Sequence, residues 1–589
     1  MCPNSGNLGG RKDRAINRPM SFATRLRSLD QGDLDVQGRL FAWSRGWRGP
    51  ALAALIALLA GLPGVFGMPP LDRDESRFAQ ASAQMLEQGE YVVIRFQHQP
   101  RFKKPVGIHW LQAASVSLTS SAEARQIWAY RLPSLLGAML AAAACAWGAA
   151  AFFSAPTALV AGAILGASFL LSTEAFIAKT DGVLAGATAL TMACLARTYL
   201  ASRERRAVGR LTLLGFWVAL AVATLVKGPI GPLMVILTSL MLCVWDKNVS
   251  WLKSLSWGWG LILFAAIVGP WAWAVTVATD GGFWQAAIGG DLVPKLAGGQ
   301  ESHGAPPGYH ALAALVQFFP ATLLLPVVLA LGWRSRQEPG VRFALCWLIP
   351  TWIVFELTPT KLSHYALPCY GALAWLAARA LEQPLTGWAR GIGIALQTGA
   401  GLLLSAAAAY LMALYGDPSD LPAAILTCSL LAGAGLSGAF WLTRGQAYRA
   451  LAWALPLGLL GHGALVALLA PRLEPLLLSQ RTEQVLGKAH LLPRQGVTPG
   501  PVAVAGYAEP SLVFAVGTGT ELGGGQDAAN ALAQDRPAVV ESRQQPAFQA
   551  ALRKQRLAPR LIGEVKGLDY SNGAKMTLSV YAPPPEETP

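Results

Sequence analysis

The chain has 589 residues, of which 53% are hydrophobic and only 14% are charged, and it contains 20 tryptophans. This composition is too apolar for a soluble globular protein and indicates a protein that crosses a membrane many times. A net charge of +14 could suggest a nucleic-acid partner. Because the basic residues gather on alternate loops between apolar segments, they set membrane topology instead, and we expect no bound nucleic acid.

The apolar segments are numerous, and a bilayer core takes about 20 helical residues per crossing. Several segments are interrupted by glycine or proline, so we expect about 13 spans, give or take two. The expected spans lie near 47–67, 128–150, 152–173, 182–200, 211–226, 229–245, 257–279, 310–332, 342–357, 364–381, 391–415, 422–442 and 450–470.

Basic residues mark one side of the membrane. They crowd residues 1–45, and they recur in the loops at 203–210, 333–342 and 443–449, whereas the loop DPSD at 417–420 has none. Because cytoplasmic loops are enriched in Lys and Arg, we expect a cytoplasmic N-terminus in a bacterial inner membrane. The tail 1–45 should be partly disordered, and an odd number of spans places the C-terminus in the periplasm.

The composition changes at about residue 472. Residues 46–471 should form the membrane domain, with a long first periplasmic loop at 68–127. Beyond 472 there is no 20-residue apolar run, and 501–517 and 577–585 alternate in the manner of short strands. We therefore predict a small soluble α/β domain at 472–589 on the periplasmic side.

The first outer loop opens with MPPLDRDESRFAQASAQ, in which acids follow directly on an apolar span. The spacing of apolar residues predicts an amphipathic helix lying on the bilayer. Asp72 or Asp74 would then be the N-cap and Glu75 would favour the helix dipole. The alternative is that a carboxylate is held at the membrane surface for chemistry.

Other ionisable residues fall at the outer ends of separate spans. Taken singly, each is explained as a snorkelling lysine or a helix cap. Taken together on one face, at membrane depth, they favour a functional site. They are Lys103 and Lys104 in RFKKPVGIHW, Lys179 and Asp181 in AKTDGVLAG, Lys227 in VKGPIGP, and Lys361, His364 and Tyr365 in TPTKLSHYALP.

These motifs resemble those of bacterial polyprenyl-phosphate-dependent glycosyltransferases of the GT-C fold, which include the lipid A aminoarabinose transferases and relatives of the protein O-mannosyltransferases. The matching stretches run in the family's order from about residue 50 to 520. They are DESRFAQASAQMLEQGEYVV, RFKKPVGIHWLQA, KTDGVLA, KGPIGP, KLSHYALPCYGALAWLAA and GYAEPSLVFAVG. The resemblance implies an α-helical GT-C membrane protein with a small C-terminal α/β domain.

The resemblance also implies roles for individual residues. Asp74 matches the family's catalytic base or acceptor-orienting acid, and Asp181 matches the Asp of the TD motif. Lys104 matches the lysine that binds the donor's lipid phosphate, and Lys361 matches the lysine of KLxxY, which we expect at the same phosphate. Further candidates are Arg77 and Lys103 for the phosphate, with Glu75, His364, Tyr365 and Lys227 in support; His109 and His303 are weaker ones.

The chain departs from the family at one position. Where the family has Glu-Lys-Pro-Pro, this sequence has Lys103-Lys104-Pro105-Val106. A carboxylate near the phosphate is thereby lost, which puts any divalent metal bound through it in doubt. We predict no bound metal, because the remaining candidate ligands are dispersed.

The chemistry fits these residue types. Transfer from a polyprenyl-phosphate sugar needs a base for the acceptor's proton and positive charge for the departing phosphate. A base and phosphate binders on opposite faces of the sugar predict inversion at the anomeric carbon. The expected partners are the lipid-linked sugar donor, lipid A or another envelope acceptor, and membrane lipids.

Other functions stay open from the sequence. The acceptor could be a protein hydroxyl, as for an O-mannosyltransferase. A transporter or flippase for a lipid-linked sugar would show inverted repeats and charges near mid-span. We find no repeat, and the charges lie at helix ends. A non-enzymatic envelope assembly protein would not need acids and lysines on one face.

Overall fold

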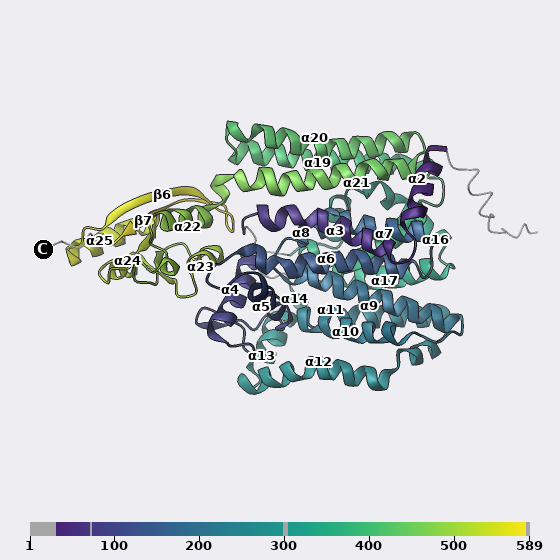
Figure 1. The fold of residues 1–589 in the computed structure, drawn as a ribbon, viewed down its shortest axis with the longest axis horizontal. Helices are drawn as coiled ribbons and strands as arrows, with labels where there is room; N and C mark the ends of the chain where they lie inside the picture. Colours follow the sequence, from purple (N-terminus) through teal and green to yellow (C-terminus); the bar gives the residue numbers. More distant parts are fainter. Residues whose placement is uncertain (1–30, 71–72, 299–303, 585–589) are drawn as a thin grey trace, which may run out of the picture.

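The structure is a computed structural model that describes residues 31–70, 73–298 and 304–584. The predictions made for the tail at residues 1–30, for Asp72 and for His303 lie outside these ranges. Figure 1 shows a bundle of roughly parallel helices with a separate small domain at one end. We call that end of the bundle the domain-facing end.

Within the described ranges, nine helices are long and apolar enough to cross a membrane. Each coincides with one of the expected spans, and they lie side by side in the bundle (Figure 1). They are α3 (Arg48–Gly67), α6 (Ile127–Ala149), α9 (Thr180–Arg203), α10 (Arg210–Lys227), α12 (Trp257–Ala278), α17 (Pro339–Leu357), α19 (Gly387–Tyr415), α20 (Leu421–Thr443) and α21 (Ala447–Ala464).

The other four expected spans are short or interrupted helices. The third breaks at Ser168, whose side chain caps the second piece by accepting the N–H of Leu171 at 3.4 Å. The eighth and tenth break around Pro320 and Pro368, where proline cannot donate to a continuing helix. The pieces are α7 (Ala155–Ala167) with α8 (Phe169–Glu174), α11 (Ile230–Asp246), α15 (Tyr309–Gln317) with η3 (Thr322–Leu324) and α16 (Leu325–Arg334), and η4 (Ser363–Cys369) with α18 (Tyr370–Ala380).

Shorter elements complete the two ends of the bundle. At the domain-facing end the first loop folds into α4 (Arg73–Gln88), a hairpin of β1 (Arg95–Phe96) and β2 (Gln99–Pro100), and α5 (Gly107–Thr119). A later loop at this end contains α13 (Gly282–Trp284), the π-helical η2 (Gln285–Leu292) and α14 (Val293–Ala297). The opposite end carries α2 (Gln31–Trp43) and η1 (Ser250–Leu255).

The C-terminal domain is a five-stranded mixed sheet in the order β4-β3-β5-β7-β6. Strand β3 pairs in parallel with β4 and β5, and β7 pairs antiparallel with β5 and β6. The strands are β3 (Ala503–Ala505), β4 (Glu521–Gly523), β5 (Ala538–Glu541), β6 (Arg560–Asp569) and β7 (Ala574–Ala582). The expected terminal strand is therefore present, but only three residues of 501–517 are a strand, because Pro510 begins a helix.

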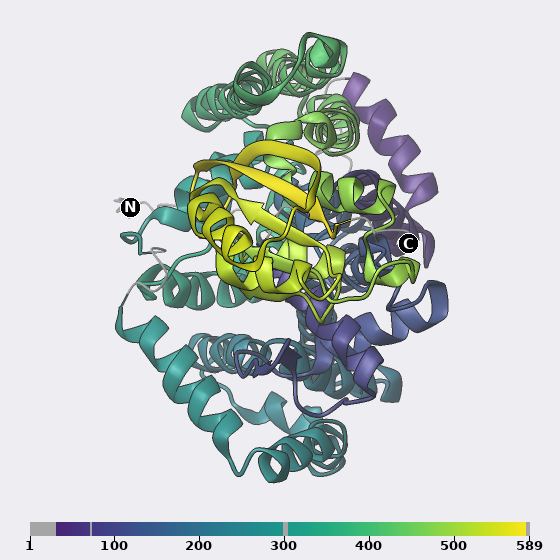
Figure 2. The same ribbon diagram turned by 90° about the vertical axis from the view of Figure 1, so that its left-hand side faces the viewer.

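Helices cover both faces of this sheet. Alternate residues of β3 point to opposite sides, so Val504 packs with α22 (Leu478–Lys488) and α23 (Pro510–Val516). Ala505 packs on the other side with α24 (Gly525–Leu532) and α25 (Gln545–Gln555). Helix α23 lies against α4 of the first loop. Seen along the bundle, the C-terminal domain lies over its centre (Figure 2).

Candidate active site

Asp74 lies in the first turn of α4, at the domain-facing end. Its side chain is 51% exposed and pairs with Arg77 at 3.4 Å and Arg101 at 3.7 Å. Partial burial acts to raise the pKa of Asp74, but the charges of Arg101, Arg77 and Lys179 outweigh it and hold this pKa below its ordinary value. Asp74 is therefore an ionised carboxylate that reaches solvent. It lies within the helix that begins at Arg73, so the N-cap interpretation is wrong for this residue.

Glu75, the next residue, is buried and points the other way. Its two oxygens accept hydrogen bonds from Arg131 of α6, from Nε at 2.7 Å and from Nη2 at 2.9 Å. The first oxygen also accepts the N–H of Ala178 at 2.8 Å. Arg131 in turn donates to the carbonyls of Gly64 and Val65 at 3.1 Å each. Glu75 thus connects α4 to three other segments. Its structural role is larger than the favourable interaction with the helix dipole that its position predicted.

Asp181 lies in the first turn of α9 and is buried. Lys227, the last residue of α10, places its Nζ 2.5 Å from one carboxylate oxygen. His364 of η4 places its Nε2 3.6 Å from the other oxygen. The same imidazole lies 3.7 Å, through Nδ1, from Glu174, which pairs with Lys179 at 3.3 Å. Residues from four segments are therefore gathered at one helix end.

Lys104 belongs to a second group, built with the later loop. Its Nζ lies 3.0 Å from Asp291, and Asp291 also pairs with Lys295 at 2.7 Å. Burial lowers the pKa of Lys104, the charge of Asp291 raises it and Lys295 lowers it, and the outcome is a pKa of about 8. Lys104 is thus a cation at neutral pH, held at a fixed place by a carboxylate from another loop.

These groups form one electrostatic environment. The charge of Lys179 acts on both Asp74 and Asp181, and that of Lys227 acts on both Asp181 and Lys104. Lys227 also lies over the ring of Tyr365, 5.3 Å from its centroid. Six of the cations named above face four carboxylates, so the site has an excess of positive charge. They are Arg77, Arg101, Lys104, Lys179, Lys227 and Lys295, against Asp74, Glu174, Asp181 and Asp291.

A cavity of about 550 Å³ is lined by Arg77 and Arg101, the two partners of Asp74. It lies between α4, the first loop, the η2–α14 segment and the β3–α23 loop of the C-terminal domain. Five cationic side chains and one carboxylate line it, which suits an anionic ligand. The charged lining residues are Arg73, Arg77, Arg101, Lys103, Lys295 and Asp291.

Lys361 is at the same end of the bundle but is bonded within its own loop. Its Nζ donates to the carbonyl of Thr358 at 2.6 Å, and the side chain is buried. It lies near His310, a buried imidazole with neither ring nitrogen hydrogen-bonded in the described structure. The convergence of Lys361 with Lys104 on one phosphate stays a prediction.

The two candidate histidines that the structure describes lie in different surroundings. His364 joins the Asp181 group, whereas His109 is buried and hydrogen-bonds Ser82 at 2.9 Å. Across the described part of the chain, no three His, Cys, Asp or Glu side chains form a set that could hold a metal. Lys103, which replaces the family's glutamate, lines the cationic cavity.

Several residues of the site were missed from the sequence. Asp291 and Lys295 are four residues apart in an expected outer loop, and that spacing of opposite charges could have identified them. Glu174 and Arg101 sit beside predicted motifs, but their partners come from distant segments. His310 gave no signal, because a single histidine near a span is usually structural.

Comparison with known proteins supports this description of the fold. The profile of the family described as Dolichyl-phosphate-mannose-protein mannosyltransferase matches residues 73–284, from the start of α4 to the end of α13. The undecaprenyl phosphate-alpha-4-amino-4-deoxy-L-arabinose arabinosyl transferase of Pseudomonas paraeruginosa is 29% identical over 444 residues, which is 73% of this chain and 77% of its own. The enzyme of that name from Pectobacterium carotovorum is 29% identical over 332 residues, 56% of this chain and 58% of its own.

The crystal structure of ArnT from Cupriavidus metallidurans bound to undecaprenyl phosphate has the same fold. It superimposes with a TM-score of 0.69 at 19% identity, covering 90% of this chain and 97% of that one. The fold is that of a multi-span membrane glycosyltransferase of the GT-C type. The chain is similar to the aminoarabinose transferases and matches the protein mannosyltransferase profile in part, so the resemblance seen in its motifs is confirmed.

Proposed function

We propose that this protein is an inverting glycosyltransferase that moves a sugar from a polyprenyl-phosphate donor to an acceptor of the bacterial envelope. The names of the arabinosyl transferase relatives favour undecaprenyl phosphate and an aminoarabinose-type sugar. Lipid A or another lipopolysaccharide component is the acceptor that fits that sugar. The reaction breaks the bond between the anomeric carbon and the phosphate oxygen, and forms a bond to an acceptor oxygen.

One observation carries this proposal. An ionised, solvent-reaching carboxylate, Asp74, pairs with Arg77 and Arg101, two of the five cations that line one cavity. A base must be deprotonated at the working pH. The lowered pKa of Asp74 keeps its carboxylate in that state. A leaving phosphate gains charge as the sugar departs, and fixed cations in a site of low dielectric stabilise that charge.

We assign the roles from position. Asp74 accepts the acceptor's proton, while Lys295, Lys103 and Arg77, which line the cavity, hold the donor phosphate. Lys104 joins them through its pair with the lining residue Asp291.

Asp181 is enclosed by Lys227 and His364. We therefore assign it the task of fixing Lys227 and orienting the sugar, while Lys361 is a further candidate at the phosphate. The chain's own residues supply every step, so no metal ion is part of this proposal.

Orientation in the membrane is part of the proposal. The basic loops lie at the end of the bundle away from the C-terminal domain, so the domain-facing end is the periplasmic one in the inner membrane. The N-terminus is then cytoplasmic, residues 68–127 and 472–589 are periplasmic, and 46–471 is the membrane domain. The donor's phosphate and an acceptor on the outer leaflet would meet at this surface.

A second acceptor has a specific observation in its favour. The family profile that matches residues 73–284 is that of protein mannosyltransferases. A serine or threonine hydroxyl of an exported protein could therefore take the place of lipid A. Mass spectrometry of lipid A and of periplasmic glycoproteins, with and without this protein, distinguishes the two acceptors.

The direct test uses the purified protein in nanodiscs with a labelled polyprenyl-phosphate sugar and lipid A. Asp74→Asn should lower turnover by about 10²–10⁴-fold, the usual contribution of a general base. Asp535→Asn, at an exposed position with φ of 57°, is the matched control, because asparagine tolerates that conformation. Near-normal turnover by Asp74→Asn would remove Asp74 from the reaction, and no transfer by the unmodified protein to either acceptor would refute the proposed function.

A further inference from the structure

The face of α4 that meets the C-terminal domain is polar and partly buried. Gln80 is fully buried on this face, and Glu87, two turns later, keeps part of its side chain in solvent. Arg125, from the loop that precedes α6, extends over the same face. Buried amide and charged groups destabilise a protein unless they are hydrogen-bonded, so this face requires partners.

Thr518 of the C-terminal domain supplies them. Its Oγ1 accepts from Gln80 Nε2 at 2.7 Å and from Arg125 Nη2 at 3.1 Å, and it donates to Glu87 Oε2 at 2.5 Å. A hydroxyl has one donor and two acceptor positions, so all its capacity is used. Arg125 closes the ring by donating to Gln80 Oε1 at 2.7 Å and by pairing with Glu87. We call Thr518, Gln80, Glu87 and Arg125 the Thr518 latch.

Two further contacts surround the latch. Gln97, in the turn between β1 and β2, donates to the carbonyls of Thr518 at 3.3 Å and Thr520 at 2.6 Å. Its own backbone N–H and carbonyl bond to the side chain of Gln84 on α4, at 2.8 and 2.6 Å. The hairpin therefore joins the same loop of the C-terminal domain to α4 a second time.

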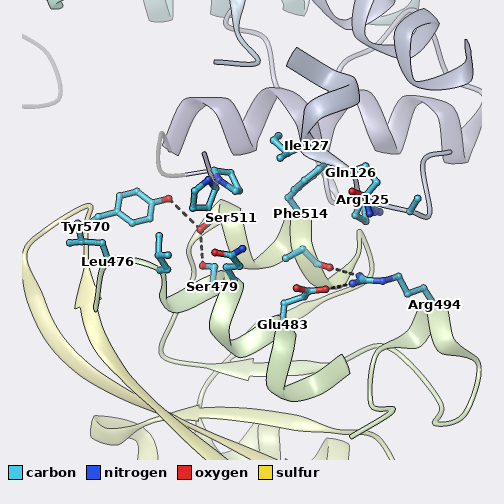
Figure 3. Close-up of a pocket in the computed structure, with 16 residues that line it drawn as sticks. Arg125, Gln126, Ile127, Leu476, Ser479, Glu483, Arg494, Ser511, Phe514 and Tyr570 are labelled. Atoms are coloured by element: carbon cyan, nitrogen blue, oxygen red, sulfur yellow. Dashed lines mark hydrogen bonds and ion pairs between the residues drawn. The ribbon is translucent and has the colours of Figure 1, made fainter. Parts of the chain in front are cut away.

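Packing extends the contact along α23. The Phe514 ring meets Tyr130 of α6 edge-on, with centroids 5.3 Å apart, and Arg125 lies 5.8 Å from its centre. Figure 3 shows Arg125 and Ile127 facing Phe514 and Ser511 across a cavity of about 230 Å³. Aromatic pairs of this kind contribute beyond their buried area and fix relative orientation.

The C-terminal domain also contacts the other end of α4. Glu509, in the loop after β3, lies 3.5 Å from Arg73, the first residue of the helix. Its neighbours Ala508 and Pro510 line the cationic cavity. The domain thus holds α4 at its first turn, its middle and its last turn, and Asp74 lies between the first two contacts.

We propose that the C-terminal domain is a positioning element for α4, and that Thr518 and Arg125 are its positioning residues. A 16-residue amphipathic helix is only marginally stable by itself, so its tilt and register depend on what it packs against. A base displaced by about 1 Å can lose about 10²-fold in rate. The inference rests on the proposed function in taking Asp74 as the base, and it requires that the domain stays on α4 during turnover.

The first test is a pair of threonine substitutions. Thr518→Val keeps the shape but removes the hydroxyl, and should lower kcat by roughly 10- to 100-fold with little change in the donor KM. Hydrogen exchange of the amides of residues 73–88 should become faster. Thr518→Ser restores the hydroxyl and should restore both readings, while Thr577→Val, the same change in strand β7, should alter neither. Unchanged kcat and exchange in Thr518→Val would overturn the proposal.

The second test separates a positioning element from a moving lid. Gln80→Cys with Thr518→Cys, in a Cys2→Ser background, removes the latch and allows a short bifunctional thiol reagent to reconnect the two positions. The other cysteines of the described structure lie in expected spans and are buried or half-buried. Cross-linking should restore kcat if the domain positions α4, whereas it should abolish remaining turnover if the domain must lift away. Hydrogen exchange of the α4 amides reports on the latch even if no sugar transfer is detected. This measurement therefore distinguishes failure of the positioning proposal from failure of the proposed function.

Discussion

At the scale of single residues, the two aspartates proposed for catalysis have opposite surroundings. Asp74 reaches solvent and is flanked by arginines, whereas Asp181 is enclosed and bonded to Lys227 and His364. Carboxylates in such different environments take different tasks. A carboxylate that takes a proton from the acceptor must be accessible to the acceptor. A carboxylate that only holds a lysine in place need not be. We therefore propose Asp74, rather than Asp181, as the base.

Lys104 gives a pH prediction. Its pKa of about 8 means that it is charged below pH 8 and loses its charge as the pH rises through 8. A hydrogen bond between charged groups contributes about 1.5–3 kcal/mol, so the donor KM should rise by roughly tenfold or more between pH 7 and 9.5. Steady-state kinetics with a short-chain polyprenyl-phosphate sugar measures this.

Two variants check the assignment to Lys104. Lys104→Arg stays charged throughout this range, so the rise in KM should disappear. The Asp291 carboxylate raises the Lys104 pKa, so Asp291→Asn should move the rise to lower pH. A donor KM that is flat up to pH 9.5 in the unmodified protein would show that Lys104 does not bind the phosphate in its charged form.

At the scale of secondary-structure elements, α4 shows what a sequence pattern can and cannot predict. The helix and its apolar side follow from residue spacing, and the structure contains both. The partner of Glu75 does not follow, because Arg131 is 56 positions away and was counted within an apolar span. Likewise Asp291 reaches Lys104 across 187 positions. Local periodicity predicts elements, whereas ion pairs between distant segments depend on how those elements are packed.

The Glu75–Arg131 pair gives the prediction at this scale. Both side chains are buried, so Glu75→Gln leaves the Arg131 charge without its counterion, a change that typically costs about 3–5 kcal/mol. Thermal unfolding of the purified protein in detergent should show a clearly lower midpoint. Glu204→Gln breaks the exposed pair with Arg206 and should leave the midpoint almost unchanged. Equal midpoints for the two variants would mean that the buried pair does not brace α4.

At the scale of the whole molecule, the sequence predicts the bundle better than it predicts how the C-terminal domain docks on it. The spans were predictable because long apolar runs have few alternatives in a chain of this composition. Their interruptions were visible as glycines and prolines, but which would break a helix was not, since Pro63 and Pro133 lie inside continuous ones. The docking of the domain on α4 depends on Thr518 and Arg125, which carry no motif.

Topology is the prediction for the whole molecule. A cysteine at Gln534, an exposed position of the C-terminal domain, should react with a membrane-impermeant thiol reagent when only the outer membrane is permeabilised. The reason is the basic bias of the loops at the opposite end of the bundle. A cysteine at Arg205, in one of those loops, is the control and should react only after lysis. The reverse pattern would place the domain and the candidate site in the cytoplasm.

The short helices α7 and α18 pack against each other, and their shortness has a consequence for the polar groups beside them. At 13 and 11 residues they are about 20 Å and 17 Å long, less than the roughly 30 Å hydrocarbon core. The remaining depth is occupied by α8 and η4, which carry Glu174 and His364. Every residue of α18 and nearly every residue of α7 is buried, so neighbouring helices separate these short helices from the lipid. Glu174 and His364 can therefore lie at membrane depth without meeting acyl chains, because non-spanning segments and polar groups are tolerated there when protein encloses them.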